Sequence, residues 1–160
     1  MLGAIIGDIV GSPYEFDDYN IKTTDFPLFS EESEITDETI MTLAVAQGLM
    51  NGNKDPKKTY DGIIKSMQDL GNKYPYMGYG SRFDTWLRTR EPKPYNSFGN
   101  GSAMRVSAVA WFFDNLEDVE KFAEILKEKG CAKVAVADLA REDMAECVED
   151  AFRYETLVLA

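Results

Sequence analysis

The stretch Thr36-Asp37-Glu38-Thr39-Ile40-Met41-Thr42-Leu43-Ala44-Val45-Ala46 decides the fold of this chain. Its apolar residues recur every three to four positions, which predicts an amphipathic α-helix that breaks at Asn51-Gly52-Asn53. The first three side chains all carry oxygen atoms and fall in the first turn of this helix. Hard divalent cations prefer such ligands, at about 2.0–2.6 Å. Thr36, Asp37 and Glu38 are therefore candidate metal ligands.

The same three residues can also serve only to cap and stabilise the N-terminus of the helix, without binding a metal ion. Thr36 is a favourable N-cap residue, and the negative charges of Asp37 and Glu38 stabilise the positive end of the helix dipole. Both interpretations stay open on the residues alone.

The residues at the start of the chain predict another helix. Small residues at positions 3, 7 and 11 occupy a second face of it, where a neighbouring helix or a ligand can approach closely. A β-strand is the alternative for this short segment. The apolar positions with helical spacing are Leu2, Ile5, Ile6, Ile9 and Val10.

A long loop is predicted over residues 12–35, with one acidic residue of interest just before it, Asp8, and one inside it, Glu15. Asp8 can be a capping or solvated carboxylate, and Glu15 can be one more member of an acidic loop. Next to a metal site, a carboxylate on such a loop can instead close over a ligand and orient a metal-bound water.

Two more helices are predicted downstream. One begins at Asp55-Pro56 and ends at Gly71, taken as a left-handed cap, and a shorter one contains Phe83, Trp86 and Leu87. The aromatic loop over residues 74–79 between them can stack on an adenine or simply pack against the core.

A glycine-rich turn follows at Gly99-Asn100-Gly101-Ser102-Ala103-Met104-Arg105. Its glycines let backbone amides face outward at a helix start, where free N–H groups and the helix dipole favour a phosphate. Arg105 can add a bidentate contact. Because glycine-rich turns before helices are common, a plain turn is the alternative.

From about residue 116 the predicted secondary structure changes from helices alone to alternating helices and strands. A charged amphipathic helix, a short β-branched run at 133–137, a further helix over 139–152 and an apolar run at 156–159 follow one another. This order predicts a short α/β segment with a parallel pair of strands.

Composition excludes several classes of function. The chain of 160 residues carries a net charge of −11, which disfavours nucleic acid and anionic membranes as partners. It contains no histidine, which excludes Ser-His-Asp and Cys-His nucleophiles and histidine-bearing zinc sites. Two cysteines, with neither a signal peptide nor an apolar span of membrane length, predict a cytoplasmic protein.

Residues 1–115 resemble the ADP-ribosylglycohydrolase family. The resemblance rests on G-x-x-x-G-D at residues 3–8 with Glu15, on T-D-E-T at 36–39 with the apolar run after it, on Tyr79-Gly80 and on G-N-G-S-A-M-R at 99–105. It implies a helical hydrolase that holds two Mg²⁺ or Mn²⁺ ions and cleaves the N- or O-glycosidic bond between ADP-ribose and a protein side chain.

The resemblance also implies roles for particular residues. Thr36, Asp37 and Glu38 fall on the first half of the metal site, and Glu15 and Asp37 become the candidate catalytic carboxylates. The turn from Gly99 through Asn100 and Gly101 to Ser102 would approach the phosphates or ribose of the ligand, with Arg105 beside it.

Two departures from the family pattern affect the expected activity. Glu38 stands where the family usually has a second aspartate, and the later D-x-D-T motif that completes the metal site is missing from this chain. The expectation is a metal-dependent hydrolase that removes ADP-ribose from a modified side chain, or a degenerate relative of one. An apolar face left uncovered by the missing helices predicts a homodimer or poor solubility.

Residues 116–160 resemble the middle of the flavodoxin-like module of flavodiiron proteins. The matching runs are 127–131, 138–144 and 150–154. Two alternatives to the hydrolase stay open: a flavin-binding module that uses FMN, and a non-catalytic fragment that binds ADP-ribose or serves in an interaction with another protein. The sequence accordingly predicts a mainly α domain over 1–115 with a short α/β segment over 116–160.

Overall fold

The computed structural model describes residues 1–15, 21–95, 101, 105, 107–119 and 121–122. These ranges contain helices and connecting loops and no strand, which confirms the predicted mainly α fold. The strands predicted for the tail lie outside the described residues. The helical elements are α1 (Leu2–Gly11), η1 (Ser12–Tyr14), α2 (Asp37–Gly52), α3 (Pro56–Lys73), α4 (Ser81–Arg88) and α6 (Ser107–Phe112).

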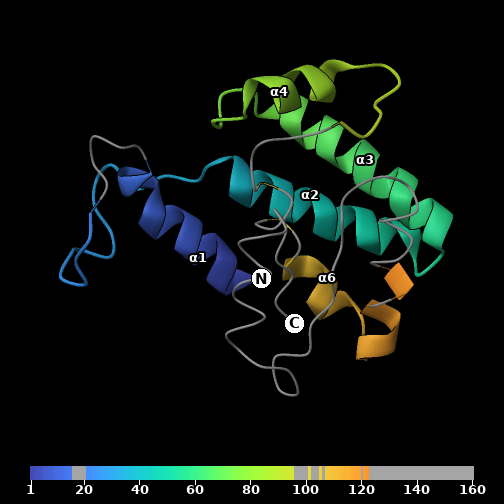
Figure 1. Ribbon diagram of the computed structural model, residues 1–160, viewed down its shortest axis with the longest axis horizontal. Helices are drawn as coiled ribbons and strands as arrows, with labels where there is room; N and C mark the ends of the chain where they lie inside the picture. Colours follow the sequence, from blue (N-terminus) through green and yellow to red (C-terminus); the bar gives the residue numbers. More distant parts are fainter. Residues whose placement is uncertain (16–20, 96–100, 102–104, 106, 120, 123–160) are drawn as a thin grey trace.

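Helix α2 is the central element of the described fold. It runs between α3 on one side and α6 on the other, and α1 approaches its N-terminal end (Figure 1). The side chains of Met41, Ala44 and Leu49 are at most 1% exposed. The sequence pattern that predicted this helix therefore also marks the core. Among the described residues, the buried apolar residues outside α2 are Met67, Leu87, Ala108, Val109, Val119 and Phe122.

Helices α2 and α3 form an antiparallel pair with very close backbones. A Cβ atom placed on Gly48 would lie 2.4 Å from the Cα of Ile63, and one on Gly52 would lie 2.1 Å from Oγ1 of Thr59. Glycine at both positions is thus required by close approach and not by backbone conformation.

The connection between α2 and α3 is set by local capping. Asn53 adopts the left-handed conformation, with φ 47° and ψ 47°, and ends α2 as the sequence predicts. Asp55 then caps α3, since its side chain accepts a hydrogen bond of 2.9 Å from the amide of Lys58, and Pro56 follows at the first helical position.

The predicted end of α3 at Gly71 is wrong. The helix continues to Lys73, with Tyr74 at its C-cap. Gly71 is helical and buried, and a Cβ atom there would lie 2.6 Å from the Leu87 side chain of α4. This glycine therefore admits a neighbouring helix, which a cap interpretation based on local sequence could not show.

Helix α4 is fastened to α3 through two side-chain amides. Nε2 of Gln68 donates to the carbonyl oxygens of Trp86 at 3.3 Å and Thr89 at 2.8 Å. Nδ2 of Asn72 donates to the carbonyl of Leu87 at 2.9 Å. These bonds reach carbonyl groups at and just after the C-terminal end of α4, so α4 is held at a defined position on α3.

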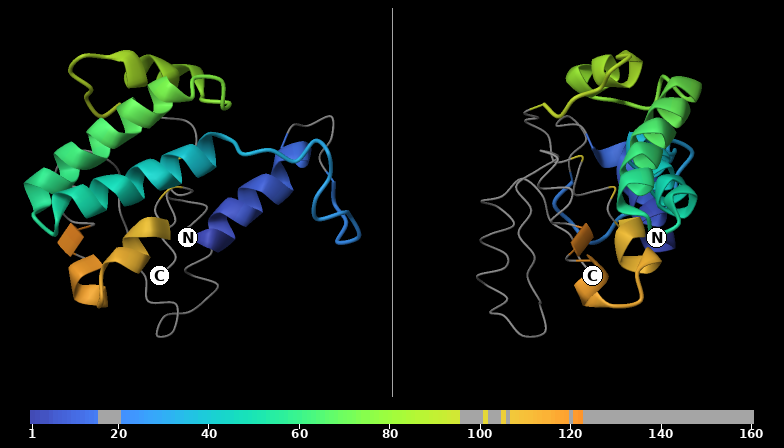
Figure 2. Two further views of the ribbon diagram at one scale, coloured as in Figure 1. Left: turned by 180° about the vertical axis from the view of Figure 1, so that it is seen from behind. Right: turned by 90° about the vertical axis from the view of Figure 1, so that its right-hand side faces the viewer.

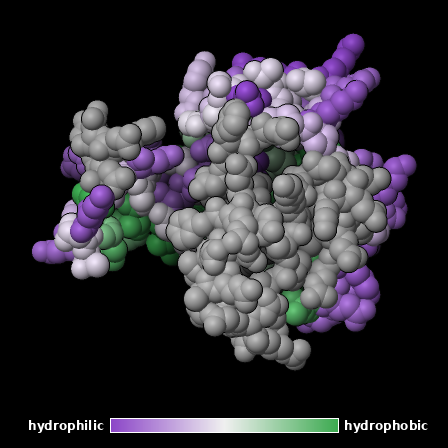
Figure 3. Space-filling model, viewed as in Figure 1, coloured by the Kyte–Doolittle hydropathy of each residue, from purple (hydrophilic) through white to green (hydrophobic). Residues whose placement is uncertain are grey.

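Helix α1 stands apart from the core. It diverges from the N-terminal end of α2, with the loop from residue 21 onward projecting beyond it (Figure 2). No α1 residue is buried, and Leu2 and Ile6 are 75% and 49% exposed. Hydrophobic surface is visible on this side of the molecule in Figure 3. Within the described part of the chain, no atom outside the local backbone of α1 and the neighbouring residues lies within 4 Å of a Cβ placed on Gly3, Gly7 or Gly11.

No helix in the described part of the chain has the length and apolar character needed to span a membrane.

The α2–α3 contact gives a direct test of the fold. Gly48→Ala should lower the free energy of unfolding by about 3 kcal/mol, because the new methyl group would overlap backbone atoms of Ile63. Gly7→Ala is the matched control, for which we expect a gain of about 0.5–1 kcal/mol from helix propensity. Urea denaturation measures both, and equal effects would contradict the packing described.

Candidate active site

One carboxylate from α1, that of Asp8, accepts hydrogen bonds from the N-terminal end of α2. Oδ1 of Asp8 accepts a hydrogen bond of 2.5 Å from the Thr36 hydroxyl, and Oδ2 accepts one of 2.5 Å from the Thr39 hydroxyl. Oδ2 also accepts from the backbone amides of Thr36 at 3.0 Å and Thr39 at 3.2 Å. Asp8 is thus a capping carboxylate for a different helix, 28 residues away in sequence.

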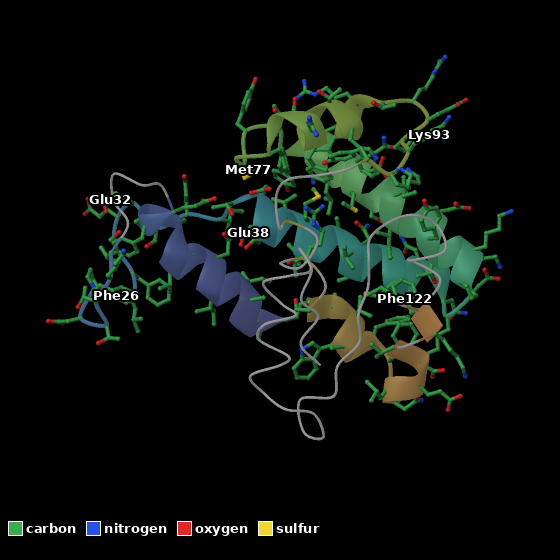
Figure 4. The ribbon with its side chains drawn as sticks, in the orientation of Figure 1. Phe26, Glu32, Glu38, Met77, Lys93 and Phe122 are labelled. Atoms are coloured by element: carbon green, nitrogen blue, oxygen red, sulfur yellow. The ribbon has the colours of Figure 1, made fainter. Side chains whose placement is uncertain are left out.

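Two further contacts hold this helix start in place. Oγ1 of Thr36 accepts from the amide of Glu38 at 3.3 Å, so Thr36 is the N-cap that the sequence predicts. The amide of Asp37 donates to the carbonyl of Met77 at 2.7 Å, which ties the aromatic loop to the same point. Figure 4 shows Met77 and Glu38 near each other at this end of α2.

The capping contacts leave the carboxylates of Asp37 and Glu38 in an unfavourable electrostatic setting. Burial raises the pKa of Glu38 to about 7, and the charges of Asp8, Asp37 and Glu15 add to the effect. Burial likewise raises the pKa of Asp37, opposed by Arg105. Such clustering of partly buried like charges is costly without a ligand, and it is typical of functional sites.

Arg105, which lies in sequence more than 60 residues after the start of α2, supplies positive charge to this cluster. Its Nε donates to the carbonyl of Gly101, and its Cζ lies 4.6 Å from the ring centroid of Phe83 on α4. Burial lowers the pKa of Arg105, while Asp37 is the strongest of the groups that raise it. The guanidinium therefore lies within electrostatic reach of the α2 carboxylates.

Tyr79 contributes a polar atom with no partner in the described part of the chain. Its hydroxyl is buried and makes no hydrogen bond there, although its ring contacts Phe83 at a centroid distance of 5.9 Å. Burial raises the pKa of Tyr79 to about 12, helped by the negative charge of Asp37. A buried, unpaired hydroxyl beside charged groups is available to a ligand.

The structure brings together most of the residues predicted for the site. Thr36, Asp37 and Glu38 share one helix turn, and the charges of Glu15 and Arg105 act on it. Gly101 provides the carbonyl that Arg105 binds. The predicted ligand-binding residues Gly99, Asn100 and Ser102 lie outside the described residues.

The sequence offered Asp8 as a capping carboxylate without showing which helix it caps, and it did not predict the roles of Met77 and Phe83. Each acts across a sequence separation of 22 or more residues, through a contact that no local pattern encodes. The G-D pair at residues 7–8 was the only available signal, and it identified Asp8 without its partners.

The donor chemistry of the site suits a hard divalent cation, but its ligand number is low. Asp37 and Glu38 offer carboxylate oxygens, which such ions prefer, and their mutual repulsion would be relieved by positive charge. Among the described residues, no three Asp, Glu, Cys or His side chains are grouped closely enough to hold a metal ion. Bound water, a ligand or further protein atoms would have to complete the coordination.

Comparisons with known proteins agree with one another. A model of the ADP-ribosylglycohydrolase family matches residues 1–154. The chain is similar to ADP-ribosylhydrolase ARH3 of Homo sapiens, at 29% identity over 78% of this chain and 41% of the relative. It is likewise similar to ADP-ribosylhydrolase ARH3 of Mus musculus, at 29% identity over 78% of this chain and 40% of the relative. The chain thus spans about two fifths of the length of the curated relatives it matches. No solved structure matches it significantly.

Removing a hydrogen-bond acceptor from Asp8 should destabilise the contact between α1 and the start of α2. In Asp8→Asn, one oxygen acceptor becomes an NH₂ donor that faces the hydroxyl and amide donors of Thr36 and Thr39. We expect a loss of about 1–3 kcal/mol in the free energy of unfolding. Asp25→Asn, in the exposed part of the loop, is the charge-matched control and should change it little. Chemical denaturation compares the two.

The raised pKa of Glu38 predicts a pH dependence of stability. Between its ordinary pKa of 4.5 and the folded value of about 7, the folded state binds more protons than the unfolded state, so stability falls as pH rises through this window. After allowance for solvent screening, Glu38→Gln should remove about 1–2 kcal/mol of this fall. Thermal unfolding from pH 4.5 to 8 checks it, and parallel profiles would contradict the assignment.

Proposed function

Because the chain belongs to the ADP-ribosylglycohydrolase family, we propose that it binds an ADP-ribose unit at the N-terminal end of α2 and hydrolyses the glycosidic bond joining that unit to a modified protein side chain. The observation that carries the proposal is the joint placement of Asp37, Glu38 and Arg105 at one Asp8-fixed helix start. In this arrangement the carboxylates can hold a cation, and the guanidinium offers positive charge to a phosphate-bearing ligand.

The reaction defines what these residues must do. Water adds to the anomeric carbon of the ribose, the bond to the side-chain nitrogen or oxygen breaks, and the leaving group takes a proton. Glu38, with a pKa of about 7, can hold or release a proton near neutral pH. Glu15 is exposed at the end of η1 and acts electrostatically on both Asp37 and Glu38, as expected for a carboxylate that orients the attacking water.

Substrate binding is assigned to the groups around Arg105. The turn over residues 99–102 is proposed to approach the phosphates or ribose, and the guanidinium to contact a phosphate. The Tyr79 hydroxyl, which has no hydrogen-bond partner among the described residues, is in keeping with a polar ligand atom at this point. The proposed partner is therefore ADP-ribose or an ADP-ribosylated protein.

Mg²⁺ or Mn²⁺ is the proposed cofactor, held in part by Asp37 and Glu38. When bound, such an ion polarises ribose hydroxyls and activates water. The Thr36 hydroxyl is already engaged with Asp8 and the Glu38 amide, so it would join the ion only in addition to its capping role. The low ligand number predicts weaker affinity than a complete dinuclear site would have.

The small number of protein ligands for a metal ion among the described residues also favours one alternative, a protein that binds ADP-ribose without hydrolysing its glycosidic bond. The predicted cytoplasmic location, homodimer and flavin-binding tail stay predictions, since nothing described in the fold bears on them.

Calorimetric titration tests the proposed function. We expect saturable Mn²⁺ binding to the full chain that strengthens about tenfold or more with ADP-ribose present and is lost in Asp37→Asn, because one of the two α2 carboxylates becomes neutral. Asp61→Asn, an exposed residue of α3, should bind as the unsubstituted protein does. Absence of both Mn²⁺ and ADP-ribose binding would refute the proposal.

An assay of product release separates hydrolysis from binding alone. Arginine-linked and serine-linked ADP-ribosyl peptides provide an N-glycosidic and an O-glycosidic substrate. Release of ADP-ribose from either one supports the hydrolase, and binding without release supports the non-catalytic alternative.

A further inference from the structure

Three aromatic residues form a column beside the proposed site. Tyr79 precedes α4, and Phe83 and Trp86 lie on that helix; the ring centroids are 5.9 Å apart for Tyr79 and Phe83 and 5.5 Å apart for Phe83 and Trp86. The rings of Phe83 and Trp86 are stacked at an interplanar angle of 15°. Nε1 of Trp86 donates to the carbonyl of Lys93 at 3.1 Å, which anchors the outer end of the column.

The inner part of this column carries a cation. The Cζ atom of Arg105 lies over the Phe83 ring, 4.6 Å from its centroid, and Nε of the same side chain donates to the Gly101 carbonyl. A long arginine side chain has many rotamers in the absence of such contacts. The ring face and the carbonyl together restrict the guanidinium to one position.

That position matters because of the charges around it. Asp37, Tyr95, Glu38 and Tyr79 are the groups that act on Arg105. Arg105 is a cation that acts on both carboxylates of the α2 start. A displaced guanidinium would leave the two carboxylates without their positive neighbour and would withdraw a donor from the ligand.

We propose that Phe83 is a positioning residue whose ring holds the Arg105 guanidinium beside the carboxylates of α2, ready for the phosphate-bearing ligand. This inference deepens the proposed function and rests on it for its consequence in binding. Its geometric part concerns only Phe83 and Arg105 and can be tested without any ligand.

Side-chain NMR of the ¹⁵N-labelled full chain tests the geometry. A guanidinium over an aromatic face has its Nε–H resonance shifted by the ring current, and Arg105→Lys identifies that resonance by its loss. Phe83→Leu should abolish the shift, and Phe83→Tyr, which keeps the ring, should retain it. Phe26→Leu is the matched control, because Phe26 contacts Tyr14 away from this column.

Calorimetry with ADP-ribose tests the consequence. We expect Phe83→Leu to weaken ADP-ribose binding about 5- to 20-fold, with Phe83→Tyr and Phe26→Leu within about twofold of the unsubstituted protein. Circular dichroism establishes that each variant is folded. If Phe83→Leu does not fold, Phe83→Met, whose unbranched side chain adapts to irregular space, replaces it in both measurements.

The outcomes separate this inference from the proposed function. A ring-current shift that survives in Phe83→Leu, or is lost there with unchanged ADP-ribose affinity, would overturn the positioning role. If the unsubstituted protein binds no ADP-ribose, the proposed function fails, and the NMR comparison alone then decides whether Phe83 holds Arg105.

Discussion

The described structure depends on one carboxylate, that of Asp8, and on the four hydrogen bonds it accepts from Thr36 and Thr39. Helix α1 buries no side chain of its own, so its position relative to α2 rests largely on this polar contact. The two backbone amides it binds are among those that a helix start leaves unpaired. A single side chain thus joins two helices and fixes the orientation of the residues that follow.

The same contact places the negative charge of Asp8 next to two partly buried carboxylates. With Asp8 facing the start of α2, the carboxylates of Asp37 and Glu38 lie beside a third acidic group and are partly buried as well. Arg105 compensates only in part, since the pKa of Glu38 still rises to about 7. A protein that keeps such a cluster gives up stability at neutral pH, and a cation or a ligand that restores it gains binding free energy in return.

Much of the fold follows from local sequence. The period of the apolar residues identifies α2, and Asn53, Asp55 and Pro56 set the connection to α3 through capping that nearby residues determine. Gly71 shows where local reasoning stops. Glycine serves equally as a left-handed cap or as space for a neighbouring helix, and the choice depends on Leu87, which lies 16 positions away.

The candidate site likewise has some features that local sequence predicts and others that depend on distant contacts. The oxygen-bearing residues 36–38 could be identified from sequence because capping and metal binding both require them, and for that reason sequence could not distinguish the two roles. Thr36 is in fact a cap, and the carboxylates beside it remain available. The carbonyl of Met77 and the ring of Phe83 could not be predicted, because a backbone acceptor leaves no residue signature and a core phenylalanine is the ordinary interpretation.

The central claim is that the Asp8-fixed start of α2 is a cation and ADP-ribose site. An anomalous difference map from crystals grown with Mn²⁺ and ADP-ribose would test it most directly. The account predicts a peak at ligand distance, about 2.0–2.6 Å, from carboxylate oxygens of Asp37 or Glu38, with the diphosphate on the Arg105 side. A map with no peak there, or with Mn²⁺ bound only at surface carboxylates elsewhere, would contradict it.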